Sequence, residues 1–87
     1  MRIISQNGEV DVPYEGAILL LNEKNNAGAV YGFELTAKYP GEDDEYILGD
    51  FNTKEEAKAM IISIAKSWMR NYPIFYCTKE ETPKERE

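Results

Sequence analysis

The sequence has no histidine and a single cysteine, Cys77, among its 87 residues. Histidine is a common general base and zinc ligand, so its absence excludes Ser-His and Cys-His nucleophile pairs and Cys/His zinc sites. A lone cysteine forms no internal disulfide, and we expect Cys77 to be a reduced thiol packed among apolar neighbours. We find no catalytic residue, cofactor-binding motif or metal site, and predict that the protein is not an enzyme.

Long apolar runs are also lacking. The longest, residues 17–21, is far shorter than the roughly 20 residues that span a membrane. The first residues lack the apolar stretch of an export signal. We therefore expect a cytoplasmic protein that does not bind membranes.

Basic residues are in the minority, with 10 Lys and Arg against 16 Asp and Glu and a net charge of -6. Proteins bind nucleic-acid backbones through clustered Lys and Arg, which displace counterions. The nearest approach to a cluster lies on a predicted helix, at Lys54, Lys58, Lys66 and Arg70. Two glutamates lie beside the first two of these residues, and we expect no direct binding of DNA or RNA.

The remaining pattern predicts a single domain over residues 1–78. A chain of this length closes roughly one sheet covered by one helix. Segments with β-type patterns occur at 1–5, 9–15, 17–21, 31–39, 46–51 and 74–77. Residues 22–28 are polar and predict a loop, and the short connections favour antiparallel neighbours. We predict an α+β fold in which four to five antiparallel strands form one sheet.

One amphipathic helix is predicted from about Thr53 to Tyr72, packed on one face of that sheet. Thr53 and Glu56 have the spacing of a capping box, which satisfies the first amides of a helix. A stripe at helical spacing consists of Ala57, Met60, Ile61, Ile64, Ala65, Trp68 and Tyr72. Residues 79–87 contain no large apolar side chain, and we expect a disordered charged tail there.

Four aromatic residues allow two interpretations. Trp68 on the helix, with Tyr31, Phe33 and Tyr39 on a strand, suggests a stacking platform for bases or another ligand. Aromatic residues at the period of their element are more often part of a core, and we favour that interpretation.

Ile62 and Met69 are candidates for a partner-binding surface. On a helical wheel they lie together at the margin of the apolar stripe, beyond what one sheet face normally covers. They therefore suggest an exposed apolar shoulder, where a protein partner or a second copy binds. The alternative is a slightly wider buried face.

The densest charge cluster is Glu42, Asp43, Asp44 and Glu45. Carboxylates attract hard cations, but consecutive residues point to alternate sides and the run lacks the spacing of a calcium loop. We interpret it as a solvated hairpin tip. With Glu9, Asp11, Glu15 and Asp50, the cluster also suggests an acidic surface that mimics nucleic acid.

The opening residues 1–8, followed by Val10-Asp11-Val12-Pro13-Tyr14-Glu15, resemble the start of small uncharacterised proteins carried by phages and prophages of Gram-positive bacteria. Residues 51–57 resemble the strand-to-capped-helix step of the same proteins. The resemblance implies a compact α+β accessory protein of the host cytoplasm with no established catalytic residues.

Three functions follow as hypotheses. The first is a non-enzymatic module that binds a protein partner or itself. The second is an acidic decoy that occupies the nucleic-acid site of a host protein. The third is a small hydrolase that uses only carboxylates, which requires a cleft with paired Asp or Glu of divergent pKa.

Overall fold

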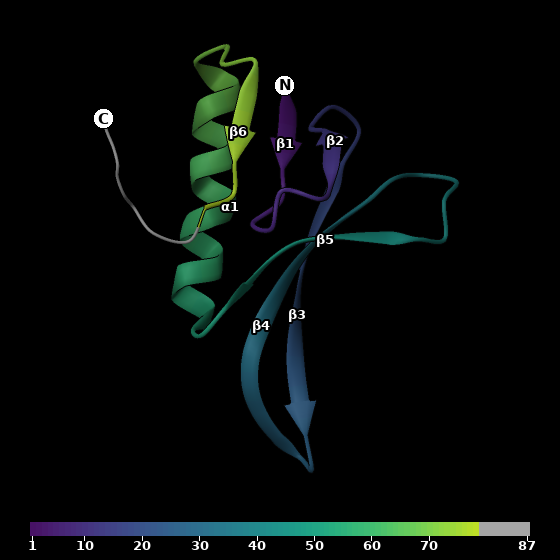
Figure 1. The fold of residues 1–87 in the computed structure, drawn as a ribbon, viewed down its shortest axis with the longest axis vertical. Helices are drawn as coiled ribbons and strands as arrows, with labels where there is room; N and C mark the ends of the chain where they lie inside the picture. The colour runs from purple at the N-terminus through teal and green to yellow at the C-terminus, as the bar shows by residue number, and fades with distance from the viewer. Residues whose placement is uncertain (79–87) are drawn as a thin grey trace.

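The computed structural model describes residues 1–78, so the predicted disordered tail at 79–87 lies outside the described residues. The elements are β1 (Arg2–Ile4), β2 (Asp11–Pro13), β3 (Ile18–Asn26), β4 (Ala29–Lys38), β5 (Glu45–Phe51), α1 (Lys54–Met69) and β6 (Ile74–Tyr76) (Figure 1). The predicted α+β class, with one helix packed on a sheet, is confirmed.

The strands form two three-stranded sheets rather than one sheet of four to five strands. The orders are β2-β1-β6 and β3-β4-β5. All neighbours are antiparallel except β1 and β6, which are parallel. A parallel pair requires a long crossover, and α1 lies in the connection that brings the chain back beside β1 (Figure 1).

The two sheets are joined at Gln6. Its backbone N–H donates to the carbonyl of Leu48 at 2.8 Å. Its side-chain amide donates to the Asp50 carbonyl at 3.2 Å and accepts from the Asp50 N–H at 2.8 Å. A Cβ at Gly49 would lie 2.7 Å from Gln6 Cδ. A side chain at position 49 would therefore clash with Gln6 in this contact.

The predicted loop at 22–28 is wrong, because β3 continues to Asn26 and a tight turn connects it to β4. Ala27 and Gly28 have φ values of 54° and 84°, and positive φ at both central residues is typical of the hairpin turn that matches strand twist. The polar composition of the segment reflects exposure rather than irregular backbone. The resulting hairpin extends well past the N-terminal end of α1 (Figure 1).

The four aromatic residues expected in the core have different environments. Phe33 and Tyr39 pack at the edge of the core, as predicted. Tyr31 is 61% exposed, so the prediction is wrong there, because this part of the hairpin lies beyond the helix that covers the sheet. Trp68 is also about half exposed, and its ring centroid lies 5.7 Å from that of Tyr14 at the rim.

The helix begins with the predicted cap. Thr53 is extended, and its hydroxyl accepts a hydrogen bond from the Glu56 N–H at 3.1 Å. The Glu56 carboxylate accepts from the Asn52 N–H at 3.3 Å. The first contact is that of a capping box, whereas the second differs from it because Glu56 reaches the amide of Asn52, one residue before the N-cap.

The helix ends at Met69, three residues before the predicted end at Tyr72. Asn71 has a φ of 64°, and the Tyr72 N–H donates to the Ser67 carbonyl at 3.1 Å. A left-handed residue followed by this bond is a Schellman ending. It turns the chain toward β6 without a glycine.

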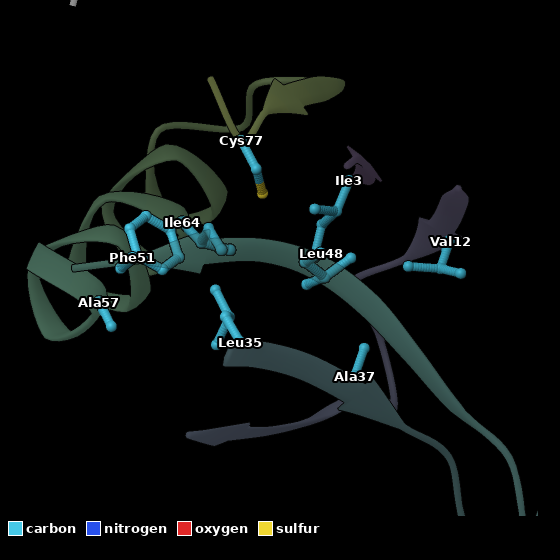
Figure 2. Close-up of a cluster of buried hydrophobic side chains, with 9 residues drawn as sticks. All are labelled: Ile3, Val12, Leu35, Ala37, Leu48, Phe51, Ala57, Ile64 and Cys77. Carbon is cyan, nitrogen blue, oxygen red and sulfur yellow. The ribbon is translucent and has the colours of Figure 1, made fainter. Parts of the chain in front are cut away.

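One apolar core connects the sheets and the helix. Its buried members are Ile3 and Val12 from the first sheet, Leu35, Ala37, Leu48 and Phe51 from the second, Ala57 and Ile64 from α1, and Cys77 after β6 (Figure 2). Cys77 is fully buried, as predicted, and its sulfur points into this cluster. Both sheets therefore depend on the same core.

Candidate protein-interaction surface

Ile62 and Met69 lie on the side of α1 that faces away from the core. Ile62 is 55% exposed and Met69 is 72% exposed, whereas Ile64 is fully buried. At 3.6 residues per turn, Ile62 points about 160° away from Ile64 and about 20° from Met69. The two residues thus form an outward stripe, not the margin of the buried face. We call Ile62 and Met69 the outer stripe.

Basic side chains frame the outer stripe. Lys58 and Lys66 are each four residues from Ile62 and therefore lie about 40° to either side of it. Arg70 lies beyond Lys66. Residues 57–72 carry these three cations and no acidic side chain, whereas the other described segments carry twelve acidic and four basic residues. We call Lys58, Lys66 and Arg70 the basic frame.

A hollow of about 280 Å³ lies beside this helix. Phe51, Ala59 and Met60 contribute apolar walls, and Asn52, Glu56 and Ser63 contribute polar ones. Around the helix, Ala59 lies about 60° from Ile62. Ser63 lies about 100° from it. The hollow therefore lies to one side of the outer stripe, and neither Ile62 nor Met69 lines it.

The four residues of the acidic cluster do not act as one group. The Glu42 carboxylate accepts from the Tyr46 hydroxyl at 3.0 Å. Glu45 lies on the other side of the sheet and accepts from the Thr36 hydroxyl at 2.8 Å and from Asn22 Nδ2 at 3.3 Å. The hydrogen bond to Glu42 raises the pKa of Tyr46. This division follows from the alternation of side chains along an extended segment.

Three of the other carboxylates proposed for an acidic surface form ion pairs. Asp11 pairs with Arg2, and Asp50 pairs with Lys24 at 2.8 Å. The amino terminus of Met1 lies 2.7 Å from Glu15. Hydrogen bonds from Arg2 and from the amino terminus lower the pKa of Asp11 and Glu15 respectively. Local cations thus offset the charge of three of the eight carboxylates named for this acidic surface.

Three hollows in the described part of the chain are each lined by a single carboxylate. The hollow of about 280 Å³ has Glu56 only, and one of about 190 Å³ between Pro13, Tyr39 and Tyr46 has Glu42 only. A third, of about 70 Å³, has Asp50 only. Within residues 1–78, no three Asp, Glu or Cys side chains are grouped to hold a metal ion.

The sequence pattern did not reveal a second exposed apolar surface. Ile18 and Ile47 are each 49% exposed on the face of the second sheet that α1 leaves uncovered. The continuous apolar run 17–21 could have indicated that Ile18 is exposed, because such runs place apolar residues on both faces of a strand. Thr36 lies between these two strands and is almost fully buried.

Comparison with known proteins does not assign the chain to a family. No protein-family model, curated protein or solved structure matches the sequence or the fold. In the part of the chain that the structure describes, no helix has the length and apolar character needed to cross a membrane.

Proposed function

We propose that this protein is a non-enzymatic interaction module, a phage-related accessory protein that binds a protein partner through the outer stripe in the cytoplasm. The observation that carries the proposal is the exposure of Ile62 and Met69 opposite the buried face of α1. Contiguous exposed apolar surface on a small domain is a common site of partner binding, and Ile62 and Met69 lie in one line along the helix. The resemblance of residues 1–15 to phage and prophage proteins supports the setting.

Capture of the tagged protein from a lysate of a Gram-positive bacterium tests the proposal, with nuclease present and mass spectrometry as the readout. We expect one protein at stoichiometric yield with the unmodified chain, and its loss with Ile62→Glu. A charge in the centre of an apolar contact is costly because it loses its hydration.

Ile18→Glu is the matched control. Ile18 has nearly the same exposure as Ile62 but lies on the uncovered face of the second sheet, opposite Lys38. We expect this variant to retain the partner, and circular dichroism to show that both variants are folded. A partner that binds Ile62→Glu as well as the unmodified chain would contradict the assignment of the surface.

A further inference from the structure

We propose that the partner of the outer stripe is an acidic amphipathic helix, rather than a second copy of this chain or a basic segment. This inference rests on the proposed function and adds the chemistry of the partner. It comes from three features of the surface: the outward helix face, the basic frame and the distance between the two apolar residues.

The helix face favours a helical partner. The middle of α1 satisfies its own backbone hydrogen bonds and presents side chains only, so it offers no edge to which a strand could pair. An extended segment laid across it would leave its own N–H and C=O groups unpaired on burial, at a cost in free energy. A helix satisfies these groups internally.

The spacing of the apolar residues sets the spacing on the partner. Ile62 and Met69 are seven residues apart, which is two turns and about 10.5 Å along the axis. A partner helix that runs alongside α1 matches this distance with aliphatic residues at positions i and i+7.

The basic frame favours an acidic partner. Among residues 1–78, the ion pairs involve Arg2, Lys24 and the amino terminus, and none involves Lys58, Lys66 or Arg70. Carboxylates on both flanks of the partner's apolar stripe would meet Lys58 and Lys66, which speeds association and excludes basic partners. Glu55 and Glu56 lie in the first turn of α1 and would repel carboxylates. We therefore expect the acidic side chains of the partner to lie toward the C-terminal end of α1.

The same charges disfavour a second copy. In a symmetric antiparallel pair, Ile62 would meet Met69 of the other copy, and Lys66 of each copy would lie close to the two-fold axis. Like charges at that position repel one another. Residues 79–87 contain glutamates but no large apolar residue that could pack on the outer stripe.

The test is a titration of the full chain, with isotope-labelled Ile and Met methyl groups, followed by NMR. The probes are two synthetic alanine-based helical peptides with leucines seven residues apart, one flanked by Glu and the other by Lys. We expect the Glu peptide to shift the methyl signals of Ile62 and Met69 but not those of Ile18 or Ile47. The Lys peptide should leave all four unchanged.

A charge exchange makes the test specific. With Lys58→Glu and Lys66→Glu combined, we expect binding of the Glu peptide to weaken by roughly tenfold or more and the Lys peptide to bind instead. Added salt should weaken the original pair, because exposed charges are screened. The double variant changes exposed side chains only, and circular dichroism checks that it is folded.

Each other outcome overturns the acidic helix as the partner. Equal shifts with both peptides would mean that the outer stripe binds apolar helices regardless of their charge. Shifts of Ile62 and Met69 that depend on protein concentration alone would identify a second copy as the occupant. Absence of any shift at these methyls would reject a helical partner of this kind, whereas the lysate capture with Ile62→Glu decides the proposed function separately.

Discussion

Cys77 shows how the environment of one residue determines its chemistry. A thiol reacts as the thiolate, and burial disfavours the charged form. The apolar surroundings raise the pKa of Cys77 from 9.0 to about 12. The thiol is therefore protonated at neutral pH and has the role of a small apolar side chain in the core.

We expect Cys77 in the folded protein to resist iodoacetamide at neutral pH. Its alkylation should be slower than that of the same chain in denaturant by roughly a hundredfold or more, because both access and thiolate formation are suppressed. Mass spectrometry of timed samples measures both rates. Similar rates in the two conditions would show that Cys77 is not held in the core.

At the scale of secondary-structure elements, the side-chain amide of Gln6 links the two sheets, because it forms hydrogen bonds with the backbone of β5 as a neighbouring strand would. The Gln6 amide makes two hydrogen bonds with the backbone of Asp50, at the edge of β5. Sheet edges carry unpaired backbone groups, and this contact satisfies two of them. The absence of a side chain at Gly49 lets Gln6 approach.

We expect Gln6→Ala to lower the free energy of unfolding by about 1–2 kcal/mol and to speed hydrogen exchange of the Asp50 amide. Gln6→Glu separates the two bonds, because it keeps the acceptor for the Asp50 N–H but places a carboxylate oxygen against the Asp50 carbonyl oxygen. We expect it to destabilise the fold at least as much as Gln6→Ala, while exchange of the Asp50 amide stays slower than in Gln6→Ala. Urea unfolding and amide exchange provide the measurements, and an unchanged Asp50 exchange rate in Gln6→Ala would contradict the role of this contact.

Element types were easier to predict than element ends. The capping residues Thr53 and Glu56 mark the start of α1 because their hydrogen bonds are local. The end of α1 was harder to predict, because the left-handed Asn71 is not the glycine that usually gives the signal. The turn at Ala27-Gly28 was missed because polar residues suit both a loop and an exposed hairpin.

At the scale of the whole molecule, the two sheets share one core. Ile3 and Leu35 come from different sheets, and both are fully buried in the same cluster (Figure 2). A small domain with a single core usually unfolds in one cooperative step. The two sheets therefore have separate backbone hydrogen bonds, but we expect them to unfold together.

We expect Ile3→Ala and Leu35→Ala each to lower the free energy of unfolding by about 2–5 kcal/mol. Each variant should retain a single transition, with far-ultraviolet circular dichroism and the fluorescence of Trp68 changing together. Ile18→Ala is the control at an exposed aliphatic position, where we expect a smaller loss. Separate transitions for the two signals would mean that the sheets unfold independently.

Local sequence patterns were enough to predict the α+β class, the helix start, the burial of Cys77 and the antiparallel pairing of neighbouring strands, because local spacing and short connections govern these features. It also singled out Ile62 and Met69. The three-dimensional arrangement was needed to show that β6 lies parallel to β1, that Gln6 joins the sheets and that the outer stripe faces away from the core between Lys58 and Lys66. These features depend on contacts between residues distant in the chain, which a local pattern does not specify.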